Sequence, residues 1–250
     1  MLDHLLHNVL LIYLLEIGAA VSGTIYLRKI IAPPRGARLI VFYLWLVVFV
    51  ESVGIYPAYA YYSNYTKLGF IEGTLLERNF WWFNIYNVVK TVMLSYFFIL
   101  QFRSLWNQKF FYILTWFITL TLIIDLLYSG GFFTQYPIYS AVAGPLYLII
   151  LILMFHKELI ESYHILNFQK SIAFYISIGM LIWHAMVTPL FIYSKYFSRT
   201  SPEFVAMHST ILQLANVFLY GIIIVGFWVC MVKGEENEGI VLKQKTKNLK

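Results

Sequence analysis

The chain has 250 residues, of which 60% are hydrophobic and only 12% are charged. Soluble domains carry roughly a quarter charged residues, so this composition argues against a water-soluble protein. A net charge of +6 would favour nucleic acid in a soluble protein, but here most basic residues lie in short connections between apolar runs, where they set membrane topology. We therefore expect a lipid bilayer as the surroundings and no nucleic-acid partner. The single cysteine, Cys230, excludes an internal disulfide and a cysteine-based zinc cluster.

Seven apolar runs follow one another along the chain, and a helix needs about 20 such residues to cross a bilayer. They predict membrane-spanning helices at Leu5–Leu27, Leu39–Tyr61, Asn79–Gln101, Phe110–Tyr128, Tyr139–Phe155, Ser171–Tyr193 and His208–Val232. The first run lacks a basic leader and is too long for a signal-peptide core, so it reads as a true span. The fifth run is short and contains Pro145.

The predicted fold class is therefore all-α, a polytopic bundle of seven transmembrane helices. One transmembrane domain covers residues 1–233, and residues 234–250 form a polar cytoplasmic tail. Because this tail starts Glu-rich and ends Lys-rich, we expect it to be disordered or to associate with the membrane surface.

The distribution of Lys and Arg predicts the orientation of the bundle. Thirteen of the 18 basic residues lie in the odd-numbered connections and the tail, four lie in the even-numbered connections, and Lys90 lies inside a span. Positive residues accumulate on the cytoplasmic side of membrane proteins. The N-terminus is therefore expected outside and the C-terminus in the cytoplasm.

Four ionisable residues lie near the middle of their predicted spans, namely Glu16, Glu51, Lys90 and His184. Ionisable groups at membrane depth are costly and often mark functional sites. We predict that Lys90 pairs with Glu51, because a carboxylate partner keeps a buried ammonium charged. A buried ion pair that merely holds spans together is an equally admissible interpretation.

Polar residues recur at helical spacing on several spans and must turn away from lipid. They line either a shared cavity open to the outside or the contacts between helices. The predicted ligand-binding or charge cluster consists of Glu16, Glu51, Lys90, His184, Asn84, Asn87, Gln213 and Asn216.

An intramembrane metal site is an alternative, with Asp125, His184 and His208 as its ligands. All three lie in the outer half of the predicted bilayer, but no HxxxH or HExxH pair supports them. We assign no catalytic residue and expect no cofactor, and the sequence contains no nucleotide-binding motif or nucleophile elbow.

Two segments carry a resemblance to a known family. They are the run from Asn84 to Phe98, which reads NIYNVVK and then SYFF, and the run Phe174–Ile182, which reads FYISIGMLI. Both resemble a seven-helix membrane family common in Bacteroidota, similar to the sensor regions of membrane-bound histidine kinases. The resemblance implies a bacterial inner-membrane sensor or accessory subunit without known catalysis. This chain departs from the family at Lys90, where an acidic residue is expected.

Three functional hypotheses follow. The first is a sensor or signalling subunit whose cavity takes a small molecule or lipid and which acts through a protein partner on the cytoplasmic side, since no output domain is present. The second is a metal-dependent lipid hydrolase, although an enzyme is the less favoured class. The third is a small proton-coupled transporter that uses Glu16, Glu51 and Lys90.

Overall fold

The computed structural model describes residues 2–162, 168–193 and 202–247, and within these ranges the chain is helical with no strand. The described part confirms the all-α class. Its elements are α1 (Leu2–Lys29), α2 (Ala37–Gly54), α3 (Tyr56–Tyr62), the 3-10 helix η1 (Gly69–Ile71), α4 (Phe80–Ile99), α5 (Leu105–Tyr128), α6 (Ile138–Ile160), α7 (Ile172–Tyr193) and α8 (Pro202–Lys247).

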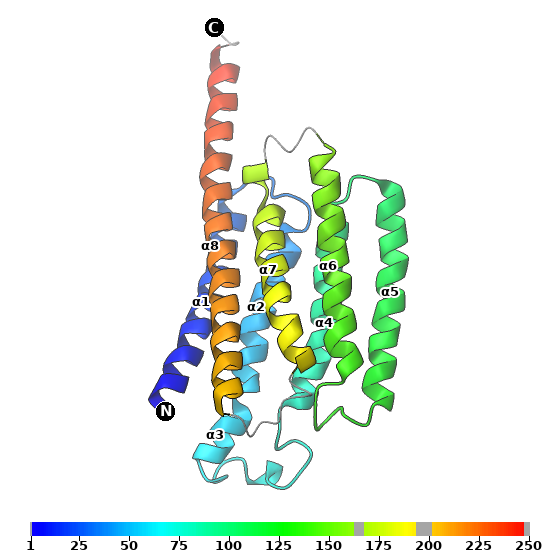
Figure 1. Ribbon diagram of the computed structural model, residues 1–250. Helices are drawn as coiled ribbons and strands as arrows, with labels where there is room; N and C mark the ends of the chain where they lie inside the picture. The colour runs from blue at the N-terminus through cyan, green and yellow to red at the C-terminus, as the bar shows by residue number, and fades with distance from the viewer. Residues whose placement is uncertain (1, 163–167, 194–201, 248–250) are drawn as a thin grey trace.

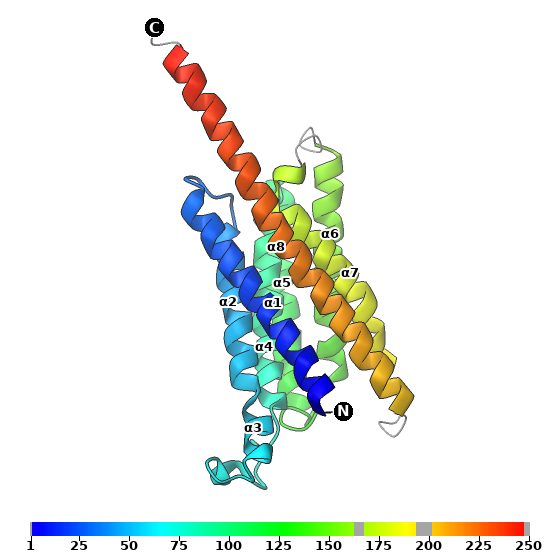
Figure 2. The ribbon, with the colours of Figure 1, turned by 90° about the vertical axis from the view of Figure 1, so that its left-hand side faces the viewer.

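The long helices run side by side in one bundle (Figures 1 and 2), and the contacts between six of those described close a ring. In the order α1, α2, α4, α6, α7 and α8, each helix contacts the next, and α8 returns to α1. The remaining long helix, α5, packs against α4 and α6 on the outside of the ring. This arrangement leaves the inward faces of the ring helices around a common interior.

Six described helices are long and apolar enough to cross a membrane: Leu10–Lys29, Ala37–Tyr62, Leu105–Tyr128, Tyr139–Ile160, Ile172–Leu190 and Phe204–Val232. They support an integral membrane protein. The predicted third span coincides with α4, which has 20 residues but is interrupted by Asn84, Asn87 and Lys90 and is not among the six. A count of seven spans therefore stays a prediction.

The outer surface of the bundle is apolar where lipid would cover it. On α5, the side chains of Ile113, Trp116, Phe117 and Leu127 are exposed over more than half of their surface. Extended exposed apolar surface of this kind is typical of proteins that contact a membrane. The packed core lies on the other side of the helices and contains Phe97 among other large side chains.

Local sequence explains where several helices begin and end. Pro33 and Pro34 follow α1, and proline cannot continue a helix. Gly36 has a φ of +79°, a left-handed conformation that favours glycine, and α2 begins at the next residue. The side chain of Ser104 accepts a hydrogen bond from the backbone N–H of Asn107 over 3.3 Å and caps α5.

Small residues let α8 approach its neighbours closely. A Cβ built on Gly226 would lie 2.6 Å from the Cβ of Tyr175 on α7, and one built on Gly179 would lie 2.7 Å from Ile222 on α8. Gly23 on α1 is equally close to Val41 on α2. Tight contacts through glycine are characteristic of helix packing in membranes, where no hydrophobic effect drives helices together.

Two helices extend beyond the predicted spans. Pro145 lies inside α6, which nevertheless runs from Ile138 to Ile160. The tail, for which we expect disorder or association with the membrane surface, is helical as far as Lys247, because the backbone of α8 continues without interruption from the bundle to that residue. Its association with the membrane surface stays a prediction. Extending an existing helix avoids the cost of nucleation. Figure 2 shows α8 projecting well past the ends of the other helices.

Candidate functional site

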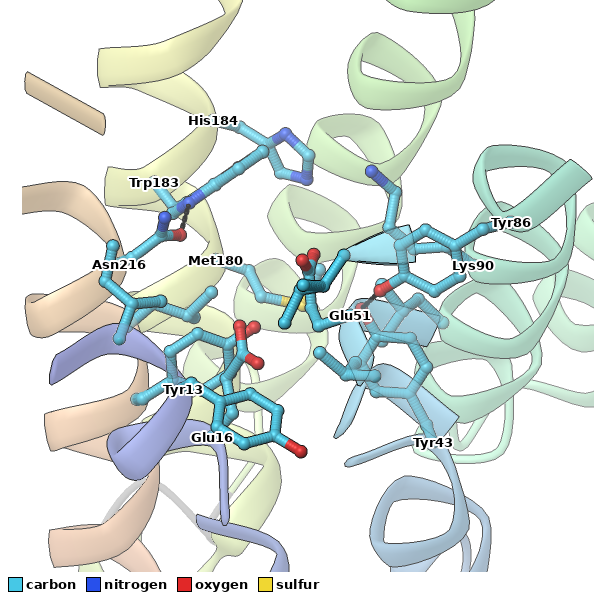
Figure 3. Close-up of a pocket in the computed structure, with 16 residues that line it drawn as sticks. Tyr13, Glu16, Tyr43, Glu51, Tyr86, Lys90, Met180, Trp183, His184 and Asn216 are labelled. Atoms are coloured by element: carbon cyan, nitrogen blue, oxygen red, sulfur yellow. Dashed lines mark hydrogen bonds between the residues drawn. The ribbon is translucent and has the colours of Figure 1, made fainter. Parts of the chain in front are cut away.

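A cavity of about 310 Å³ lies between α1, α2, α4, α7 and α8, and we call it the central cavity. Figure 3 shows the side chains that surround it. Its lining consists of Ile12, Tyr13, Glu16, Tyr43, Val47, Glu51, Ile55, Tyr86, Lys90, Leu94, Met180, Trp183, His184, Asn216, Leu219 and Tyr220.

The four ionisable residues predicted to lie at one depth do meet in this cavity. Glu16 comes from α1, Glu51 from α2, Lys90 from α4 and His184 from α7. Figure 3 shows all four side chains facing one space. The ring of helices therefore brings ionisable residues that are far apart in the sequence into one cluster.

The predicted ion pair between Lys90 and Glu51 does not form. No ion pair of 4.0 Å or less joins these two residues, both of which lie in the described part of the chain. The Nζ atom of Lys90 lies instead 5.6 Å from the ring centroid of Trp183 and 5.9 Å from that of Tyr86. The electron-rich faces of aromatic rings also attract an ammonium group, so these two rings are its neighbours in place of the carboxylate.

Two of the ionisable side chains are buried with polar atoms that have no protein partner. His184 is 1% exposed, and neither of its ring nitrogens has a hydrogen bond. Glu16 is 4% exposed, and its Oε2 atom likewise has no hydrogen-bond partner. Buried polar groups are nearly always hydrogen-bonded in native proteins, so such atoms call for an explanation.

Aromatic side chains hold the cavity walls together by hydrogen bonds across helices. The hydroxyl groups of Tyr43 and Tyr86 lie 3.2 Å apart and join α2 to α4. The indole N–H of Trp183 on α7 donates to the Asn216 Oδ1 atom on α8 over 2.7 Å. Sequence reasoning overlooked Tyr43 and Trp183, because aromatic residues are abundant throughout this chain. The four-residue spacing from Tyr86 to Lys90 is a signal that places both on one helix face.

A second cavity of about 240 Å³ adjoins the first and extends towards α6; we call it the side cavity. It shares four lining residues with the central cavity, namely Glu51, Tyr86, Lys90 and Trp183. Thr188, which is 7% exposed, lines it with an unpartnered hydroxyl group. The two cavities therefore meet at the same charged and aromatic residues.

Asn84 and Asn87 line the side cavity but use their amide groups to hold the structure. The Asn84 Nδ2 atom donates to the carbonyl oxygens of Phe132 and Gln135, over 2.9 and 3.1 Å, in the connection between α5 and α6. The Asn87 Nδ2 atom donates to the carbonyl oxygen of Ser140 over 3.2 Å. The predicted cluster thus contains residues that position the wall as well as residues that face the cavities.

Tyr136, in the connection between α5 and α6, also lines the side cavity. Burial, reinforced by the negative charge of Glu51, raises the pKa of the Tyr136 phenol to about 12. The remaining member of the predicted cluster, Gln213, lies on α8 but lines neither cavity.

The alternative metal site is not assembled by the described residues. Asp125 on α5 accepts hydrogen bonds at its Oδ2 atom from the backbone N–H and the hydroxyl group of Ser140, over 2.9 and 2.6 Å. His184 lies on α7 and lines the central cavity, which has no lining residue from α5. His208 contacts the ring of Phe204 on α8. No three His, Cys, Asp or Glu residues of the described chain converge as metal ligands.

Comparison with known proteins leaves the site to be interpreted from its own chemistry. No protein-family model, no curated protein and no solved structure matches the chain. The arrangement itself offers carboxyl groups, an ammonium group, an imidazole and several hydroxyl groups within one membrane-embedded cavity. Such a set can bind a polar ligand or exchange protons with it.

Proposed function

We propose that this chain is a sensor or signalling subunit of a bacterial inner membrane. Seven helices span the bilayer, with the N-terminus outside and the C-terminus in the cytoplasm. A small molecule enters the central cavity from the outside, and α8 passes the binding event to a protein partner in the cytoplasm. The chain itself performs no catalysis in this proposal.

The low hydropathy of α4 is compatible with a seventh span, because its polar residues line cavities inside the bundle. Its 20 residues match the length that a bilayer requires, and its polar residues Asn84, Asn87 and Lys90 line cavities inside the bundle. A span that contacts lipid over little of its surface does not need high hydropathy, because its polar groups face protein or a cavity. Seven spans place the termini on opposite sides, in agreement with the distribution of basic residues.

The continuity of α8 is the observation that carries the proposal. This helix lines the central cavity with Asn216 and Tyr220 and continues unbroken to Lys247. At about 1.5 Å a residue, the stretch from Tyr220 to Lys247 covers roughly 40 Å. A rotation or tilt of α8 at the cavity would thus move a helix end outside the bundle, where a partner can bind. A transporter has no need for such an extension.

Cross-linking in the host membrane tests this function. We expect one protein to be enriched with the full chain and to be lost when Glu235 and Glu236 are both changed to Lys, which alters the projecting part of α8 and leaves the bundle intact. The amount of this partner that is cross-linked should also change in the cavity variant Asn216→Ala. Identical sets of cross-linked proteins for all three chains would contradict the proposal.

A proton-coupled carrier is the second candidate, favoured by the four ionisable groups in one cavity. Ionisable side chains within membrane helices commonly form proton relays. The purified chain would then be reconstituted into proteoliposomes with an imposed pH gradient. Addition of substrate should dissipate this gradient. Glu51→Gln should abolish this release, whereas Glu161→Gln, at an exposed position on the end of α6, should not.

A further inference from the structure

The ionisable side chains of the central cavity divide into two pairs of opposite character. The carboxyl groups of Glu16 and Glu51 line the cavity from α1 and α2, whereas the nitrogen-bearing side chains of Lys90 and His184 line it from α4 and α7. In Figure 3, Lys90 and His184 lie towards one side of the cavity, while the two carboxyl groups lie towards the other. The central cavity therefore has an acidic wall formed by α1 and α2 and a basic wall formed by α4 and α7.

Within the described part of the chain, no ion pair joins the two walls. Lys90 makes no ion pair of 4.0 Å or less with Glu51, the acidic residue that lines both of its cavities. On the acidic wall, the Oε2 atom of Glu16 is buried without a hydrogen-bond partner. On the basic wall, both ring nitrogens of His184 are also buried without a hydrogen-bond partner. Burial of polar and charged groups is costly unless they are partnered. A molecule that partners both walls at once would remove this cost.

The volume and the remaining lining limit what that molecule can be. About 310 Å³ is near the lower end of the roughly 300–1,000 Å³ typical of ligand sites, which fits a small metabolite and not a phospholipid. Tyr43, Tyr86 and Trp183 supply ring surfaces between the charged walls. Such surfaces pack against an apolar group and also attract an ammonium group.

We propose that the central cavity binds a small zwitterion of the α-amino acid class with an apolar side chain, its ammonium group held by Glu16 and Glu51 and its carboxylate by Lys90 and His184. This assignment rests on the proposed function, for which it names the class of ligand. An amino acid carries both charges within one small molecule, and both walls line one cavity. A plain amine or a plain carboxylic acid would leave one wall without a partner.

Binding of three matched compounds tests this assignment. The full chain in lipid nanodiscs is titrated with phenylalanine, with phenethylamine, which lacks the carboxylate, and with 3-phenylpropionate, which lacks the ammonium group. Leucine, methionine and tryptophan are titrated alongside to cover other apolar side chains. We expect at least one of these amino acids to bind at least tenfold more tightly than the amine and the acid.

Charge-specific variants identify the walls. Glu51→Gln should weaken the amino acid at least tenfold, as should Lys90→Met, whereas the exposed control Glu161→Gln should change nothing. If none of the amino acids binds, or if the amine or the acid binds as tightly as the amino acid, the zwitterion assignment is wrong. The zwitterion assignment is also wrong if the control Glu161→Gln weakens binding as much as Glu51→Gln and Lys90→Met do.

A reporter on the projecting helix separates this assignment from the proposed function. An environment-sensitive fluorophore on Lys243→Cys, in a Cys230→Ser background, reports on α8 beyond the bundle. Amino-acid binding with a fluorescence change supports both proposals. Binding without any change leaves the ligand assignment standing and contradicts the sensor function, whereas a change produced only by the amine contradicts the ligand assignment alone.

Discussion

Trp183 on α7 donates its indole N–H to the amide oxygen of Asn216 on α8, over 2.7 Å, while its ring lies 5.6 Å from the ammonium group of Lys90 on α4. One side chain of α7 thus contacts two further helices of the ring, α8 and α4, at the central cavity. A ligand that displaces the Lys90 ammonium would also shift the Trp183 ring and, through the hydrogen bond to Asn216, move α8. This contact is the physical link that a sensor of this design requires.

Removal of the acceptor at Asn216 should weaken the contact between α7 and α8. The variant Asn216→Leu removes the acceptor of the part-buried Trp183 indole N–H, and a hydrogen bond of this kind contributes about 0.5–1.5 kcal/mol. We expect a lower melting temperature of the purified chain in detergent. Thr210→Ala, an exposed position on the same helix, is the matched control and should unfold like the unchanged chain.

Replacement of Lys90 distinguishes a ligand-binding ammonium from a structural ion pair. Loss of one partner of a buried ion pair destabilises a protein by about 3–5 kcal/mol. Because Lys90 contacts rings instead of a carboxylate, Lys90→Met should leave the melting temperature unchanged or raise it. A large fall in the melting temperature of Lys90→Met, with recovery in the Lys90→Met, Glu51→Gln double variant, would show that the two residues form a structural pair.

The glycine contact between α7 and α8 should tolerate no larger residue. A Cβ on Gly226 would meet the Cβ of Tyr175 at 2.6 Å, so Gly226→Ala must push the two helices apart, at a cost of about 1–3 kcal/mol. Gly221 lies on the same helix with nothing within 4 Å of an added Cβ. Thermal unfolding in detergent should therefore show a loss of stability for Gly226→Ala and none for Gly221→Ala.

The orientation of the bundle can be tested by cysteine labelling in intact cells. In a Cys230→Ser background, a membrane-impermeant thiol reagent should label Lys67→Cys, which lies in the connection between α3 and α4. It should label Lys109→Cys, near the start of α5, only after the cells are permeabilised. The reverse pattern would place the N-terminus in the cytoplasm and would reject the orientation inferred from the basic residues.

Apolar runs located the helices well, because a membrane span must be both long and apolar. The predicted spans Leu39–Tyr61 and Ser171–Tyr193 closely match helices of the structure. The exception is α4, where polar residues that serve the cavities lower the hydropathy of the helix. The helical state of the tail was missed, since its polar composition is that of a disordered segment whereas its helix continues from α8.

The ionisable residues of the site were predictable, but its aromatic lining and its contacts were not. Depth along each span brought Glu16, Glu51, Lys90 and His184 together, because parallel helices of one bundle place residues of equal depth side by side. The partner of Lys90 was not predictable, since rotation of a helix about its axis decides whether a side chain meets a carboxylate or a ring. That rotation follows from packing, including the glycine contacts of α8.

Access of water to the central cavity is the claim on which the whole account depends. It is tested by cysteines at three successive positions of α8 in a Cys230→Ser background, labelled from the outside with an impermeant thiol reagent. Asn216 lines the cavity, Ala215 is packed with none of its surface exposed, and Leu214 lies on the apolar outer surface. The account predicts rapid labelling at Asn216→Cys and slow labelling at Ala215→Cys and Leu214→Cys. Equally slow labelling at all three positions would mean that the charged cluster is a closed polar core and would contradict ligand binding from the outside.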